Sequence, residues 1–290
     1  MTKLKYYLKE MRVHHYIKNL LIVVPLACSG SLFDRQKLLS AIFGFLAFSF
    51  ISSTVYIIND IKDVDVDRKN PVKCKRPIAS SAISVKSAII LAVLLFILAN
   101  IANFMCFSAI STLILLSYFA INLGYCFGLK NIPLLDIAIL VSGFVLRALY
   151  GSFITGIQIS NWLYLVIISA AFYLGFGKRR NELLKRESGK EVRKVMDFYN
   201  LGFLDKNMYV CMALVFVFYS LWSVDEKTIE VYKGNQLIWT VPVIMLIFMK
   251  YSMTVEKNSD GDPVEVLLHD KALIVICSLY LLLMFVLLYV

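Results

Sequence analysis

The residues from Ser87 to Leu129 include no charged side chain. About 20 apolar residues suffice for a helix to cross a bilayer, so this run is long enough for two crossings. A second charge-free run extends from Leu38 to Ile58. Because backbone groups inside a bilayer must find hydrogen-bond partners within the chain, such runs predict membrane-spanning α-helices. The composition agrees, since 59% of the 290 residues are hydrophobic and the mean hydropathy is +0.73, values typical of an integral membrane protein.

We therefore expect an all-α, polytopic membrane protein in which residues 1–290 form one domain with about nine transmembrane helices. The predicted spans are about 19–33, 38–58, two within 87–129 joined by a turn at 100–103, 134–155, 162–177, 207–224, 236–249 and 272–290. Two large polar loops, 59–86 and 178–206, interrupt them. The second combines charged and apolar residues, a pattern that suits a helix lying on the membrane surface.

The distribution of charge predicts the orientation. If the N-terminus is cytoplasmic, the outside loops hold only Arg35, Lys37, Lys227 and Lys233, while the inside loops hold the other cations apart from Arg147, which lies within a span. This asymmetry follows the positive-inside rule and puts both large loops in the cytoplasm. It also accounts for the net charge of +10 without nucleic acid, for which no basic soluble domain is present. The basic N-terminal segment, Arg12 included, is predicted to be interfacial, whereas Lys18 stands at the start of the first span.

A dense acidic stretch, from Asn59 to Arg68, follows the second span. If the helix continues, Asp60, Asp63 and Asp67 share one face at i, i+3 and i+7, with Asn59 beside them. Three carboxylates on one face favour a hard divalent cation, and Mg²⁺ usually binds together with a phosphate. A solvated acidic loop is the alternative. An EF-hand is excluded, because Arg68 stands where its glycine should be and Cys74 where its glutamate should be.

The cations next to this stretch suit a diphosphate. Lys73, Lys75 and Arg76 lie in one short loop, and arginine often binds phosphate oxygens as a bidentate fork. The alternative is that this loop is basic only because it lies in the cytoplasm. That alternative explains Arg76 less well, since Arg76 lies between Lys75 and Pro77.

Charged residues inside or at the ends of later spans form a second group of candidates. Arg147 lies mid-span, where an arginine faces the protein interior and has a partner. A structural ion pair with an acid is the alternative to a substrate contact, and Asp136 lies about three turns earlier on a similar face. Arg179 and Glu182 are spaced for local helix pairing. Six scattered cysteines indicate neither a disulfide framework nor a zinc site.

Together these stretches resemble the UbiA-type intramembrane prenyltransferase superfamily. The pattern Asn59-Asp60-x-x-Asp63-x-x-x-Asp67 at the end of the second span resembles its first aspartate-rich motif. Within the superfamily the chain is most similar to the decaprenyl-phosphate phosphoribosyltransferase branch. Further matches are Lys18-Asn19, Lys75-Arg76-Pro77-Ile78-Ala79, Pro133-Leu134-Leu135-Asp136, Gly143 to Ala148, and Gly177-Lys178-Arg179 followed by Glu182. The resemblance implies helices around a central cavity that opens to the cytoplasm.

The resemblance also implies the reaction. The protein would transfer 5-phosphoribosyl from 5-phosphoribosyl 1-diphosphate to a polyprenyl phosphate in a bacterial plasma membrane and release diphosphate. The catalytic residues would be Asp60, Asp63 and Asp67, which would hold Mg²⁺ together with Asn59. The substrate-binding residues would be Asn59 with Lys18, Arg68, Lys75, Arg76, Lys130, Arg147, Lys178, Arg179 and Glu182. The loop at 178–206 lacks the second D-x-x-D-type motif of the superfamily, which weighs against an aromatic prenyltransferase. That prenyltransferase and a membrane transporter remain the alternatives.

Overall fold

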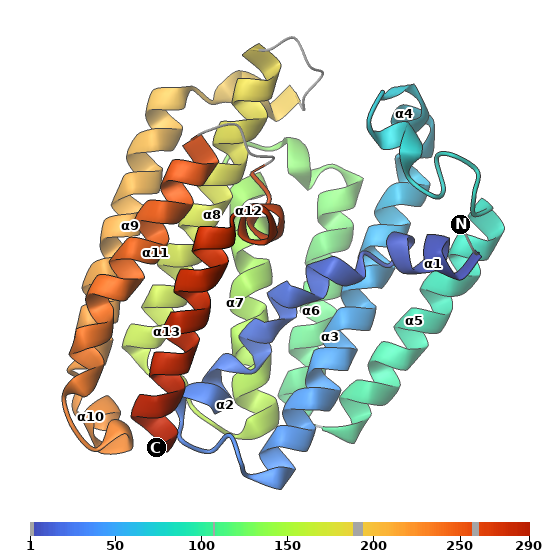
Figure 1. Ribbon diagram of the computed structural model, residues 1–290. Helices are drawn as coiled ribbons and strands as arrows, with labels where there is room; N and C mark the ends of the chain where they lie inside the picture. The colour runs from blue at the N-terminus through green and yellow to red at the C-terminus, as the bar shows by residue number, and fades with distance from the viewer. Residues whose placement is uncertain (1–2, 107, 188–193, 257–260) are drawn as a thin grey trace. The chain divides into compact units, whose positions relative to one another are not determined.

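The structure is a computed structural model that describes residues 3–106, 108–187, 194–256 and 261–290. Within these residues all regular elements are helices (Figure 1). Seven of them are long and apolar enough to cross a membrane: α3 (Arg35–Lys62), α5 (Val85–Met105), α6 (Ala109–Phe127), α7 (Leu135–Thr155), α9 (Leu201–Ser223), α11 (Val241–Glu256) with the preceding η5 (Gln236–Thr240), and α13 (Lys271–Tyr289). The all-α membrane class is therefore confirmed, whereas the count of nine is not.

The remaining elements are shorter or more polar. They are α1 (Lys3–Glu10), η1 (Val13–Ile22), α2 (Val24–Cys28), α4 (Val64–Lys69), η2 (Lys73–Lys75), η3 (Leu129–Asn131), α8 (Asn161–Glu187), η4 (Lys194–Phe198), α10 (Glu226–Tyr232) and α12 (Pro263–His269). The described helices divide into two compact units. The first comprises residues 1–26, 33–129 and 146–157, and the second comprises 27–32, 130–145 and 158–290. The single domain stays a prediction.

Helix α3 is the central element of the first unit and packs along α5 (Figure 1). It begins where Asp34 accepts hydrogen bonds from the amides of Gln36 and Lys37, so the predicted short turn is the N-cap of this helix. Small buried residues such as Ser49 and Ser53 allow neighbouring segments to approach closely. At the other end, α3 stops at Lys62 and α4 starts at Val64, so the helix is broken at Asp63.

Three predicted boundaries are wrong. The segment predicted as the first span is divided at Val23 between η1 and α2, and the second residue of α2 is Pro25, which has no amide N–H to donate. The turn predicted at 100–103 lies further on, because Asn103 stays inside α5 and donates a hydrogen bond to Thr112 of α6. The start of the predicted loop at 178–206 continues α8 as far as Glu187, and residues 188–193 lie outside the described residues.

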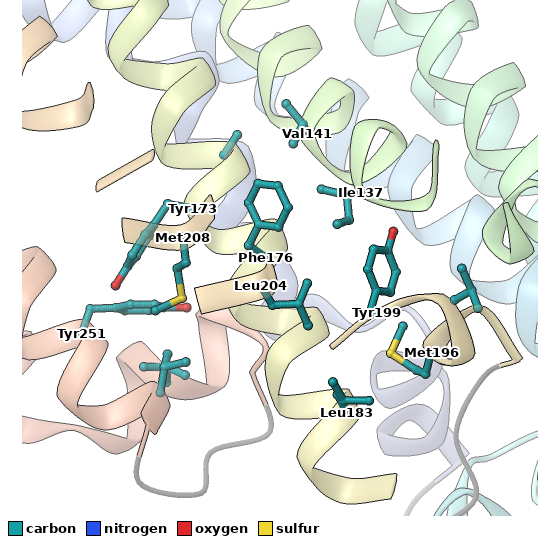
Figure 2. Close-up of a cluster of buried hydrophobic side chains, with 14 of the residues drawn as sticks. Ile137, Val141, Tyr173, Phe176, Leu183, Met196, Tyr199, Leu204, Met208 and Tyr251 are labelled. Carbon is teal, nitrogen blue, oxygen red and sulfur yellow. The ribbon is translucent and has the colours of Figure 1, made fainter. Parts of the chain in front are cut away.

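A buried cluster fixes α8 within the second unit. Tyr173, Phe176 and Leu183 of α8 belong to a core that also includes Ile137 of α7 and Tyr199, as Figure 2 shows. Helix α9 packs along α8, and Leu204 and Met208 contribute to the same cluster. The further residues of this cluster include Val141, Met196 and Tyr251.

Candidate functional site

Two carboxylates of the predicted acidic face come together in the first unit. Asp60 is in the last turn of α3 and Asp67 is in α4, and they are only 3% and 2% exposed. The Nη1 atom of Arg76 lies 3.0 Å from Oδ1 of Asp60 and 2.6 Å from Oδ2 of Asp67. One cationic nitrogen is therefore shared by both buried carboxylates.

The other acidic residues have different positions. Asn59 donates a 3.4 Å hydrogen bond from its amide nitrogen to Oδ1 of Asp60. Asp63 is half-buried at the junction of α3 and α4, so the aspartates lie on a broken helix and not on the continuous face that their spacing suggests. Asp65 points away from the cluster, since its side chain is 86% exposed and pairs with Arg68 at 3.3 Å.

Arg12 is a member of this cluster that the sequence analysis missed. Its Nη2 atom donates to both oxygens of Asp60, at 2.7 and 2.9 Å, and its guanidinium carbon lies 4.8 Å from the centre of the Tyr56 ring. The interfacial position predicted for Arg12 gave no indication of these contacts. The only sequence signal for Arg12 is its position just before the first apolar segment, and that position does not identify Asp60 as its partner.

The backbone of Arg12 is also unusual. Its φ of 52° and ψ of 48° are left-handed helical values, which cost a non-glycine residue on the order of 1–3 kcal/mol. The contacts with Asp60 and Tyr56 offset this cost and direct the side chain into the carboxylate cluster. Residues held in strained backbone conformations by their surroundings are common at functional sites. The conformation of Arg12 therefore supports a functional role for this residue.

Glu10, the last residue of α1, was also missed. It is 1% exposed, and burial and the charge of Asp60 raise the pKa of its carboxyl to about 7, although Arg12 and Arg76 lower it. Packing explains its position, because Tyr6 and Tyr7 of α1 contact a buried cluster that includes Ile57 of α3. This packing holds the end of α1 at the carboxylates.

The donor set fits a divalent cation. A hard cation such as Mg²⁺ prefers carboxylate and amide oxygens, and usually keeps several waters with one or two carboxylates. Asp60 and Asp67 already share one cationic atom, so their oxygens are close enough to be bridged through a single positive centre. Asn59 and Asp63 are next to them in the chain and supply further oxygen donors.

The remaining cations of this region differ in accessibility. The Nζ atom of Lys73 lies 3.9 Å from Oδ1 of Asp67, and Lys75 is exposed. Arg68 is exposed and donates from Nε to the carbonyl of Ala79 at 3.3 Å. Lys18 is half-buried in η1, with its Nζ atom 3.5 Å from His15.

Arg147 lies in a buried polar network of the first unit. Its Nε atom donates to Oδ1 of Asn19 at 2.7 Å, and its Nη2 atom donates to the hydroxyls of Tyr118 and Ser52 at 3.1 and 3.3 Å. The guanidinium also lies over the ring of Phe48. The mid-span arginine therefore faces the protein interior, as predicted.

In the second unit, Asp136 pairs with Arg179. The Nε atom of Arg179 lies 2.5 Å from Oδ2 of Asp136, and its Nη1 atom donates to Glu182 at 2.5 Å. Tyr199 donates to the other oxygen of Asp136 at 2.6 Å and accepts from the amide of Leu134, whose φ of 65° is left-handed. The guanidinium of Arg179, which is fully buried, thus has two carboxylate partners.

Two further predicted residues belong to the second unit. Lys178 is half-buried, and its Nζ atom lies 3.9 Å from Oδ2 of Asp262 at the start of α12. Lys130 is half-buried in η3. The central cavity stays a prediction. That Lys130 and Lys178 lie near the carboxylate cluster also stays a prediction.

The sequence and the fold are similar to those of known proteins. Residues 20–269 match the model of the UbiA prenyltransferase family. The decaprenyl-phosphate phosphoribosyltransferase of Corynebacterium glutamicum is 32% identical over 92% of this chain and 81% of its own length, and that of Mycobacterium tuberculosis is 29% identical over 91% and 88%. A UbiA homologue from Archaeoglobus fulgidus, solved with GPP and Mg²⁺, has 19% identity and a TM-score of 0.73 over 98% of this chain and 100% of its own. The chain therefore belongs to the UbiA prenyltransferase family.

Proposed function

We propose that this protein transfers a 5-phosphoribosyl group from 5-phosphoribosyl 1-diphosphate to a membrane polyprenyl phosphate of the decaprenyl type, with Mg²⁺ as cofactor. The observation that carries the proposal is the cluster of Asp60 and Asp67 with Arg12 and Arg76, which offers carboxylates to a metal and guanidinium groups to a diphosphate. The names of the relatives, each a decaprenyl-phosphate phosphoribosyltransferase, support the choice of donor and acceptor.

The reaction breaks the bond between ribose C1 and the diphosphate, which leaves with the electron pair. A new bond forms between C1 and an oxygen of the lipid phosphate. Mg²⁺ bound by Asn59, Asp60, Asp63 and Asp67 would stabilise the negative charge of the leaving diphosphate. Carboxylates near C1 favour the positive charge that develops there. The lipid phosphate is already anionic, so the reaction requires no strong general base.

The cations bring two anionic substrates together. Arg76 is within reach of the carboxylate cluster, and Arg68 and Lys75 are exposed beside it in sequence. We propose Lys18, Lys130, Arg147 and Lys178 as the further phosphate contacts. Arg179 and Glu182 act through their buried cluster with Asp136, because the Arg179 side chain is fully buried. Holding the reacting groups together accounts for a large part of the rate acceleration in such a transfer.

The proposed location is the plasma membrane of a bacterium, with the N-terminus and both polar loops in the cytoplasm. The concentration of lysine and arginine in alternate loops supports this orientation. It would give the carboxylate cluster access to a water-soluble donor.

The test is a transfer assay with the full chain in membranes, with radiolabelled 5-phosphoribosyl 1-diphosphate, decaprenyl phosphate, and either Mg²⁺ or excess chelator. The expected result is a labelled lipid that forms only with the metal. Labelled lipid formed equally well in chelator would refute the metal role. Parallel reactions contain a prenyl diphosphate and an aromatic acid, and turnover of that pair alone would replace this proposal with aromatic prenyl transfer.

A further inference from the structure

The oxygens of Asp60 and Asp67 already face cationic side chains of this chain. Arg12 binds both oxygens of Asp60, while Arg76 binds Oδ1 of Asp60 and Oδ2 of Asp67. The remaining oxygen, Oδ1 of Asp67, lies 3.9 Å from the Nζ atom of Lys73. The two carboxylate side chains are only 4% and 2% exposed, so a metal ion must share or displace these contacts.

A divalent cation without a diphosphate gains little binding free energy at such a site. It would have to take oxygens from Arg12 and Arg76, whose side chains are only 22% and 28% exposed. The displaced guanidinium groups would then lie beside the metal with fewer acceptors, and like charges at short range repel each other strongly in a partly buried site.

A diphosphate removes this obstacle. Its oxygens accept hydrogen bonds in the fork geometry that guanidinium groups favour, and its negative charge is shared between the metal and the arginines. The displaced side chains therefore exchange one anionic partner for another. Binding of the metal and binding of the diphosphate become coupled, and this coupling acts equally in both directions.

We propose that Arg12 and Arg76 change partners from the carboxylates to the diphosphate, so that the site binds a divalent cation tightly only together with a diphosphate. This inference rests on the proposed function, and it makes Arg12 a donor-positioning residue. The site thus discriminates against free divalent cations, and the carboxylates are released for the metal only when the leaving group is present.

Two features keep Arg12 close during this exchange. Its left-handed backbone sets the direction in which the side chain leaves η1, and its guanidinium carbon contacts the ring of Tyr56 without involving Asp60. The buried carboxyl of Glu10 also interacts electrostatically with Arg12 and Arg76. These contacts keep the guanidinium groups beside the site when the aspartates bind the metal.

The test measures metal binding directly. The full-length protein in detergent is dialysed to equilibrium at matched free Mn²⁺ concentrations, without and with inorganic pyrophosphate, and protein-bound Mn²⁺ is counted. In the wild type, pyrophosphate is expected to raise the affinity for Mn²⁺ about tenfold or more, within the range of about 5–150-fold that is typical of coupled sites. Equal affinity with and without pyrophosphate would overturn the inference.

The variants identify the residues responsible. In the Arg12→Gln, Arg76→Gln double variant, bare Mn²⁺ is expected to bind about tenfold more tightly, and the effect of pyrophosphate to fall to about twofold or less. Arg35→Gln is the matched control, since Arg35 is an exposed arginine at the start of α3, and it should behave as the wild type. Unchanged affinity for bare Mn²⁺ in the double variant would contradict the exchange.

Two further measurements keep the outcomes separate. Size-exclusion profiles and thermal midpoints report whether each variant folds. If the double variant does not fold, Arg12→Lys decides the question: it keeps the charge but loses the fork, and its affinity for bare Mn²⁺ should rise at least about threefold. Coupled binding without formation of labelled lipid would discard the proposed function alone, whereas formation of labelled lipid without coupling would discard only this inference.

Discussion

The Nη1 atom of Arg76 lies between Oδ1 of Asp60, at 3.0 Å, and Oδ2 of Asp67, at 2.6 Å. It joins the end of α3 to α4 across the break at Asp63. The two aspartates therefore form one buried unit with a shared positive charge, and the candidate site depends on both.

Asp67→Asn should lower phosphoribosyl transfer about 100-fold or more while the protein still folds. The amide has nearly the same shape but loses the charge that binds a metal. Initial rates of labelled-lipid formation measure the effect. Asp65→Asn is the matched control, because this aspartate is in the same helix with its side chain 86% exposed. Equal losses in the two variants would mean that α4 matters only through its overall charge.

Arg179→Met should destabilise the protein strongly. Asp136 would be left buried without its cation, and removal of one member of a buried ion pair costs about 3–5 kcal/mol. Thermal unfolding in detergent measures the change. Glu182→Gln should shift the midpoint much less, because its side chain is 18% exposed and Asp136 still holds Arg179. An Arg179→Met protein of normal stability that has lost donor binding would instead indicate direct contact with substrate.

The sequence predicts helix α3 and its acidic end better than it predicts side-chain contacts between residues far apart in the chain. A charge-free run followed by aspartates at helical spacing is sufficient to predict a spanning helix with Asp60 at its end and Asp67 nearby. The pairing of Arg179 with Asp136 is harder to predict, because the two residues are far apart in the sequence and several acids were available. Arg147 illustrates the same limit, since the structure gives it Asn19, Ser52 and Tyr118 as neutral partners.

Arg12 was missed for a local reason. Sequence patterns assume helical or extended backbone, and its left-handed conformation turns the side chain in a direction that helical spacing does not predict. Asn103 gave a wrong prediction for a different reason. Its polarity predicted a turn, but its side chain makes hydrogen bonds with Thr112 and Tyr150 while it remains within helix α5.

Gly151→Ala should impair folding in the membrane. A Cβ atom at this position would lie 2.0 Å from the backbone carbonyl oxygen of Ile22, which cannot move without shifting η1. The expected result is less folded protein and a lower thermal midpoint. Gly202→Ala is the matched control in α9, since its Cβ would meet only the Asn200 side chain at 3.5 Å, and alanine favours a helix. Equal stability of the two variants would contradict the close approach of α7 and η1.

Glu10→Gln should change the pH dependence of stability. The pKa of Glu10 is raised to about 7 by burial and by Asp60, so between its ordinary value of 4.5 and about 7 the folded protein binds the proton more tightly than the unfolded chain. This residue's contribution to stability is therefore fully present below pH 4.5 and is lost as the pH rises towards 7. Thermal midpoints of the wild type and Glu10→Gln are compared at intervals from pH 4.5 to 8. The variant should lose this component of the pH dependence, so that its stability relative to the wild type rises with pH. If the plots of thermal midpoint against pH are parallel for the two proteins, Glu10 has the same pKa in the folded and unfolded states. That result would contradict a pKa raised by burial at the end of α1.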